Sequence, residues 1–221
     1  MRVLIIILTL SVLITCKPER TDSVRDRFME SVIKLRKVGL FEAYKNLTHE
    51  QLTDSLIKTA EKNHEFGGFN DFKDVYDPLN NERKFDLHVA ELDKERVWWY
   101  DLEADVCKEN LIYSETIKDF GKLSAGYLKP KEIKEEWKSD TGPIEISFWD
   151  GDTLRTFRPE YNDDWYDTKF FDFLQTSMTR NGSPYRFYMH EETGQDVFLI
   201  RVTDYEKRRI ETEMNWTLVQ F

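Results

Sequence analysis

Hydrophobic residues recur every three or four positions in several stretches of the chain, which is the spacing of an amphipathic helix. Residues 21–38 place Phe28, Val32 and Leu35 on one helical face, and Gly39 follows as a stop. Two capping-box patterns, one at 48–51 and one at 203–206, predict the starts of two more helices. The same spacing predicts helices over 114–124 and 164–180, and a short one that begins at Pro130 and carries Ile133 and Trp137.

Alternating hydrophobic and polar residues predict β-strands in the second half of the chain. Residues 85–92 and 96–106 read as two strands joined by a tight connection, and 144–148 turns back into 153–158 through a glycine turn. A third hairpin pairs 185–189 with 197–202, and 216–221 supplies an edge strand. Val197–Ile200 is apolar on both faces, which is typical of a central strand.

This order of elements indicates the α+β class, with an antiparallel or mixed sheet covered on one face by helices. Residues 21–64 form an N-terminal helical hairpin, and the polar, glycine-containing residues 65–84 form a loop. The main body spans 85–221 and forms one domain with the hairpin.

The first residues have the pattern of an export signal. A basic start at Met1-Arg2 precedes an apolar run over 3–14, which is shorter than the roughly 20 residues that span a bilayer. The run ends in Leu13-Ile14-Thr15-Cys16, which resembles the signal of bacterial lipoproteins. That resemblance implies a signal peptide at 1–15, a lipid on Cys16 and a tether at 16–20. It places the protein in the cell envelope, held to a membrane on the periplasmic or surface face. Ordinary signal cleavage, releasing a soluble protein, is the alternative.

Composition and charge limit the possible partners. The chain is 40% hydrophobic and 14% aromatic, enough to build a core, and its net charge is −10. An acidic surface repels nucleic-acid phosphates, so we expect no nucleic-acid partner. A basic protein or a glycan remains open as a partner. Cys16 and Cys107 are the only cysteines, so a lipid on Cys16 excludes an intramolecular disulfide.

Asp101, Glu103 and Asp105 alternate along the predicted strand 96–106, and would therefore share one face of it. Such a face simply keeps an aromatic strand soluble, or it meets a basic partner or a divalent cation. A third interpretation is a glycosidase-like pair of carboxylates, such as Asp101 and Glu103.

A second acidic cluster surrounds an aromatic residue at Asp163-Asp164-Trp165. Carboxylates beside exposed rings are typical of sugar-binding surfaces. The competing interpretation is structural: Asp163 or Asp164 caps the helix at 164–180, Asp167 complements its dipole, and Trp165 packs in the core.

No sequence motif indicates a catalytic residue, a metal site or a cofactor. The four histidines, His49, His64, His88 and His190, lack metal-ligand spacing. The stretch from Arg96 to Trp165 resembles small bacterial α+β proteins of the toxin-immunity kind, through Arg96-Val97-Trp98-Trp99, Tyr113, Gly126, Trp137 and Asp163-Asp164-Trp165.

The sequence therefore favours a membrane-tethered lipoprotein that binds a partner through an acidic, aromatic-rich surface and is not an enzyme. An immunity-type inhibitor of an exported toxin, which the resemblance implies, and a carbohydrate-active hydrolase are the two alternatives.

Overall fold

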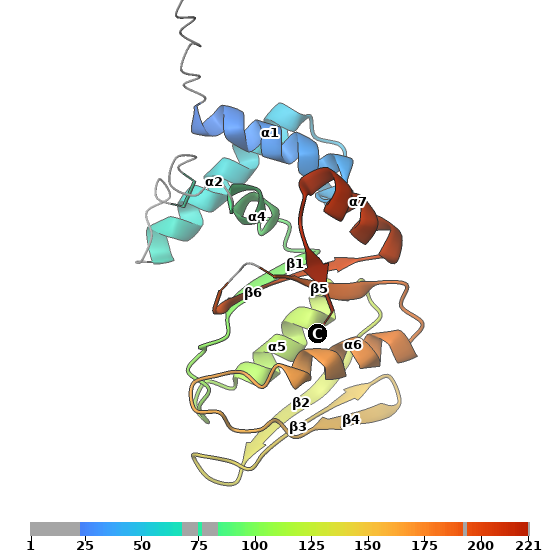
Figure 1. The fold of residues 1–221 in the computed structure, drawn as a ribbon. Coiled ribbons are helices and arrows are strands. Elements are labelled where there is room, and N and C mark those ends of the chain that lie inside the picture. The colour runs from blue at the N-terminus through green and yellow to red at the C-terminus, as the bar shows by residue number, and fades with distance from the viewer. Residues whose placement is uncertain (1–22, 68–74, 77–83, 192–193, 221) are drawn as a thin grey trace, which may run out of the picture.

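The computed structural model describes residues 23–67, 75–76, 84–191 and 194–220 (Figure 1). The predicted signal peptide, Cys16, the tether at 16–20 and most of the loop at 65–84 lie outside these ranges. The helices are α1 (Val24–Lys37), the short 3₁₀ helix η1 (Glu42–Tyr44), α2 (His49–Gly67), α4 (Phe85–Ala90), α5 (Ile112–Leu123), α6 (Lys169–Arg180) and α7 (Asp204–Met214). The α+β class is thus confirmed.

The strands form two separate antiparallel sheets rather than one. A four-stranded sheet has the order β1-β6-β5-β7 and a three-stranded sheet the order β2-β3-β4. The strands are β1 (Val97–Asp101), β2 (Pro130–Trp137), β3 (Ile144–Asp150), β4 (Thr153–Phe157), β5 (Arg186–His190), β6 (Asp196–Val202) and β7 (Leu218–Val219). The predicted central strand and the predicted C-terminal edge strand are both confirmed.

The four-stranded sheet is covered on both faces, not on one as the sequence indicated. Helices α1, α2, α4 and α7 lie on one side of it, and α5 and α6 lie between it and the three-stranded sheet (Figure 1). The residues of β6 contribute to two hydrophobic cores, one on each face of the sheet. Phe198 and Ile200 pack in the core formed with α1, α2, α4 and α7, whereas Val197 and Leu199 pack in the core formed with α5 and α6. Each such buried side chain contributes about 1.5–3 kcal/mol to stability, and β6 therefore contributes to both cores.

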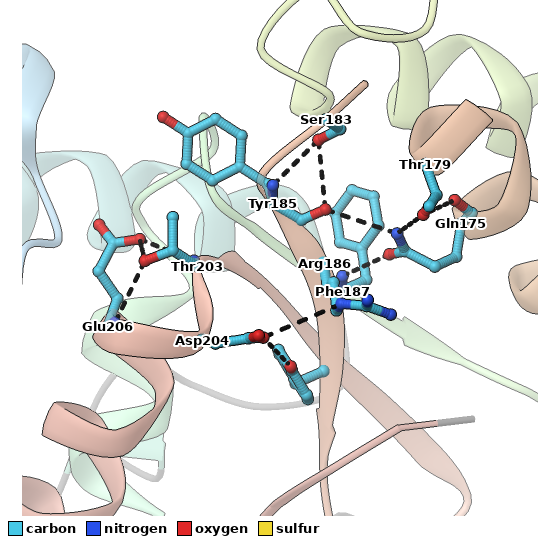
Figure 2. Close-up of polar contacts among 10 residues, drawn as sticks. Gln175, Thr179, Ser183, Tyr185, Arg186, Phe187, Thr203, Asp204 and Glu206 are labelled. Carbon is cyan, nitrogen blue, oxygen red and sulfur yellow. Dashed lines mark hydrogen bonds and ion pairs between the residues drawn. The ribbon is translucent and has the colours of Figure 1, made fainter. Parts of the chain in front are cut away.

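Local capping signals fix three helix starts. Ser23 caps α1 through a hydrogen bond from the Asp26 N–H, and Thr48 and Gln51 exchange the two bonds of a capping box. At α7 the Thr203 hydroxyl accepts from the Glu206 N–H, while the Glu206 carboxylate accepts from the Thr203 N–H (Figure 2). The two capping boxes involve residues three apart, which is why the sequence predicts them correctly.

Two predicted elements are wrong in type. Residues 85–92 were expected as a strand, but 85–90 form helix α4, whose Phe85, Leu87, Val89 and Ala90 are all buried. In so short a helix, buried on most sides, the apolar positions fit both a strand and a helix pattern. The Phe85 ring packs on Phe28 of α1 at 5.8 Å between centroids, so distant packing decides the structure.

The segment that begins at Pro130 is strand β2 instead of a short helix. Its register against β3 shifts between Lys131 and Lys134, and Glu132 adopts a φ of 51°. This β-bulge adds a residue to the strand. It interrupts the alternation that would have identified a strand, and leaves Ile133 and Trp137 at a spacing that resembles a helix.

The side-chain amide of one residue forms hydrogen bonds with part of the outer edge of β5. Gln175 of α6 accepts a hydrogen bond from the Phe187 N–H at 2.7 Å and donates to the Tyr185 carbonyl at 3.5 Å (Figure 2). The strand β7 pairs with Met189 and His190 further along the same edge. The edge is thus paired partly by a strand and partly by a side chain.

Candidate functional site

The two acidic segments singled out in the sequence lie side by side. The Ala104 N–H donates to the Asp164 carbonyl at 2.8 Å, and the Tyr166 N–H donates to the Leu102 carbonyl at 3.0 Å. Glu103 and Trp165 form an antiparallel bridge between these bonds. The backbone therefore joins two segments about sixty residues apart into one surface.

Gln195, in the β5–β6 hairpin, brings two of the carboxylates together. Its amide nitrogen donates to Asp101 at 3.0 Å and lies 3.4 Å from Glu103. The Asp101 carboxylate also accepts from the Glu103 N–H at 2.9 Å, which turns the chain out of β1. The regular strand ends at Asp101, so the expectation that it runs to residue 106 is wrong. Asp101 and Glu103 meet because of a turn and an amide, not because of strand alternation.

The remaining acidic residues are held by turns. Asp105 has a φ of 51°, and the Asn110 amide donates to its carbonyl at 2.7 Å and to its carboxylate at 3.2 Å. Asp163 has a φ of 52° in a turn closed by the Trp165 N–H and the Asn162 carbonyl. Aspartate and asparagine tolerate this left-handed conformation better than most residues, which suits them to these turns.

We call the resulting surface the acidic face, defined as Asp101, Glu103, Asp105, Asp163, Asp164 and Trp165. All six residues are exposed, and Trp165 is 43% exposed. Among the described residues, none of the five carboxylates lies within ion-pair distance of a lysine, arginine or histidine. Their negative charges are therefore available to positively charged groups of a binding partner.

Buried tyrosines support the acidic face from beneath. The Tyr166 hydroxyl contacts the Thr116 hydroxyl and donates to the Ile112 carbonyl, and its ring packs edge-on against Tyr113 at 5.3 Å. Burial raises the pKa of Tyr166 far above its usual range and that of Tyr113 to about 12. Both hydroxyls stay neutral at physiological pH, so they anchor the surface rather than exchange protons there.

The structural interpretation of the second cluster is wrong in two respects. Helix α6 begins at Lys169, and its cap residue Thr168 makes no side-chain capping bond, so neither Asp163 nor Asp164 caps it. Trp165 is exposed rather than packed in the core. Asp167 does serve the helix start: its buried carboxylate accepts from the Lys169 N–H at 3.1 Å and from the Glu160 N–H at 2.9 Å.

The acidic face is an open, solvent-exposed surface. Within the described ranges, no group of three or more histidine, cysteine, aspartate or glutamate side chains is placed to hold a metal ion. The carboxylates of Asp101 and Glu103 are both exposed to solvent, whereas a general acid is normally held in a concave, partly dry site. Exposed carboxylates around an exposed indole instead offer charge and stacking area to a partner.

Sequence reasoning missed two residues of this region. Gln195 lies in a polar hairpin with no motif around it, and only the folded chain brings it to Asp101 and Glu103. Tyr100, which precedes Asp101 in β1, is 38% exposed and connects the acidic face to the edge of β1. Partial burial is the main cause that raises the pKa of Tyr100, and the negative charges of the Asp119 and Asp101 carboxylates raise it further.

Comparison with known proteins finds no matching family model, no matching curated protein and no matching solved structure. In the part of the chain that the structure covers, no helix combines the length and apolar character needed to cross a bilayer. The function is therefore inferred from the residues of this chain.

Proposed function

We propose that the protein is a non-enzymatic binding protein of the bacterial cell envelope, tethered to a membrane by a lipid on Cys16, and that its acidic face binds a basic protein. The anchor follows from the sequence of residues 1–16 alone. The geometry of the folded domain supports the binding role.

The observation that supports binding is the convergence of five exposed carboxylates, without cationic partners in the described structure, around Trp165. Elsewhere many acidic side chains are paired, as Glu206 is with Arg96 at 2.7 Å. Unpaired charges of one sign attract a partner of opposite sign and speed its association. The exposed indole adds the kind of large apolar contact that dominates binding energy at interfaces.

An immunity-type inhibitor would be one form of this function, with a basic exported toxin as the partner. A glycan ligand is a second candidate, favoured by the exposure of Trp165 among carboxylates that can accept hydrogen bonds from sugar hydroxyls. The two candidates differ in salt dependence, because charge pairing weakens with salt while stacking does not.

The test replaces all five carboxylates of the acidic face by amides: Asp101→Asn, Glu103→Gln, Asp105→Asn, Asp163→Asn and Asp164→Asn. Immobilised full-length protein in detergent is exposed to envelope extracts at low salt, and the retained proteins are eluted with rising salt. We expect the wild type to retain a basic protein that the variant loses.

A matched control neutralises the same number of exposed acids elsewhere: Glu42→Gln, Glu50→Gln, Glu61→Gln, Glu136→Gln and Asp152→Asn. Equal loss in both variants would show that net charge, and not the acidic face, retains the partner. Retention of a glycan that resists salt and is lost in Trp165→Ala would favour the second candidate. The lipid is tested separately by mass spectrometry of the wild type and of Cys16→Ser.

A further inference from the structure

Strand β1 is an edge strand of the four-stranded sheet, and its outward backbone groups are paired only at its start, where the Val97 N–H donates to the Asp93 carbonyl at 2.9 Å. The Arg201 N–H donates to the Arg96 carbonyl and the Leu102 N–H to the Gln195 carbonyl, so even-numbered residues of this strand bond to β6. Backbone groups alternate in direction along an antiparallel strand, and those of Trp99 and Asp101 therefore point away from the sheet. No hydrogen bond to the Trp99 N–H or carbonyl is present within the described ranges.

A hollow of about 340 Å³ runs beside this edge, between β1 and α5. Its lining includes Val97, Trp99 and Tyr100 of β1 and Asp119 and Lys122 of α5. An added strand would therefore find both backbone partners and space for its side chains.

Two other edges are less available for pairing. The outer edge of β5 is paired by Gln175 and by β7, as described above (Figure 2). Strand β2 is interrupted by its bulge and carries lysines and glutamates, both of which discourage pairing. Strand β1 has no bulge and is rich in aromatic residues.

The charges along the hollow run from basic to acidic. Trp98 packs on Phe120 late in α5, while Tyr100 packs on Tyr166, which itself contacts Tyr113 at the start of α5. Helix α5 therefore runs antiparallel to β1. Lys94 and Lys122 lie toward the start of β1, and Asp119 and Asp101 lie toward its end.

The basic end of this edge in one copy of the chain is complementary in charge to the acidic end of the same edge in a second copy. When two copies of β1 pair antiparallel about a two-fold axis, the start of one strand faces the end of the other. The lysines of each copy then face the aspartates of its neighbour, and Trp98 and Tyr100 of the two strands come together across the axis. The ion pairs inside one copy, Lys94–Glu91 and Lys122–Asp119, do not prevent this, because the lysines are 59% and 75% exposed.

We propose that two copies of this chain associate through β1, forming one antiparallel sheet from the two four-stranded sheets. The association goes beyond the proposed function, since it uses the edge of the sheet and the surface of α5, and of the acidic face only Asp101, the last residue of β1. It adds hydrogen bonds at Trp99 that the single copy lacks.

The first test reverses charges on α5, on the surface of a helix where folding is little affected. Sedimentation of the full chain in density-matched detergent measures dimer formation over a wide range of concentration. We expect the wild type to dimerise, and Asp119→Lys and Lys122→Glu each to raise the dissociation constant about tenfold, because like charges then meet. An equimolar mixture of the two variants should restore wild-type association, because each lysine then faces an acid.

Misfolding or association through the apolar N-terminus would not be rescued by mixing. A wild type that stays monomeric at every concentration overturns the proposal. So does a dimer that both variants leave unchanged.

The second test follows amide hydrogen exchange along β1. In dilute protein the Trp99 amide should exchange much faster than those of Trp98 and Tyr100, which bond to β6. At high concentration we expect protection of Trp99 that Asp119→Lys abolishes. Protection of Trp99 at every dilution would mean that another part of the same chain covers the edge, and would overturn the proposal.

Discussion

The two edges of the four-stranded sheet differ in whether their outward backbone groups have hydrogen-bond partners. Along β5, the Gln175 amide takes the place of a neighbouring peptide group at Tyr185 and Phe187, and β7 pairs with Met189 and His190. Along β1, the outward groups of Trp99 meet no such partner among the described residues, and a hollow lies beside them. One sheet therefore combines an edge finished by its own chain with an edge left available.

The edges also differ in how they are held to the rest of the molecule. The β5 edge is held by a neutral amide and by the Phe187 side chain, which is almost completely buried and packs 4.6 Å from the Phe120 ring. The start of the β1 edge is held by an ion pair, in which Arg96 lies 2.7 Å from Glu206 of α7. A neutral contact and a charged contact respond differently to pH, so the comparison is open to measurement.

The largest effect is expected on the finished edge. Phe187→Ala should lower the free energy of unfolding by about 3–5 kcal/mol, because it leaves a cavity between β5 and α5. Tyr100→Ala on the open edge should cost clearly less, since that ring is 38% exposed. Denaturant unfolding of both variants measures the difference. Equal losses would show that the two edges are equally bound into the core.

The second effect is specific to pH. Although burial raises the pKa of Glu206, hydrogen bonds from Thr203 and the Arg96 ion pair outweigh it and lower that pKa below its usual value. A lowered folded-state pKa stabilises the fold above the unfolded-state value and loses that contribution as pH falls through the folded-state value. Glu206→Gln should therefore cost about 1–2 kcal/mol at neutral pH.

The cost of Glu206→Gln should shrink in acid, where the wild-type carboxylate is protonated as well. Unfolding of the wild type and the variant at several pH values, starting from neutral, measures this. A cost that is independent of pH would mean that the ion pair does not hold the start of β1.

The smallest of the three effects concerns the amide itself. Gln175→Ala should cost about 1 kcal/mol, since it leaves the Phe187 N–H without a protein partner and leaves the Tyr185 carbonyl with only the Ser183 hydroxyl as a donor. The cost should be nearly constant with pH, in contrast to that of Glu206→Gln. Amide exchange at Phe187 reports the loss directly. Unchanged exchange would show that Gln175 does not protect this edge.

The sequence predicts those elements whose determinants are local. The capping boxes at Thr48 and Thr203 involve neighbouring residues, the alternation in β3 is uninterrupted, and β6 is apolar on both faces. It fails at α4, where packing on α1 decides between helix and strand, and at β2, where a bulge hides the alternation. In both places the deciding contact is distant in sequence.

The same limit applies to the acidic face. Its carboxylates and Trp165 stand out in the sequence, but their convergence depends on bonds between residues 102–104 and 164–166. Gln175 and Gln195 carry no signal at all, because a surface glutamine acquires a role only when folding places a backbone or carboxylate group before it. Composition indicates the chemistry of the surface, and the tertiary structure assembles it.

The Gln175 side chain has a consequence for the size that assemblies of this protein can reach. A sheet with one available edge joins a single neighbour, and the pairing then closes. A sheet with two available edges can add neighbours at both ends without limit, which is the geometry of a fibre. The Gln175 amide, together with β7, occupies the second edge and thus favours a finite complex over open-ended polymerisation.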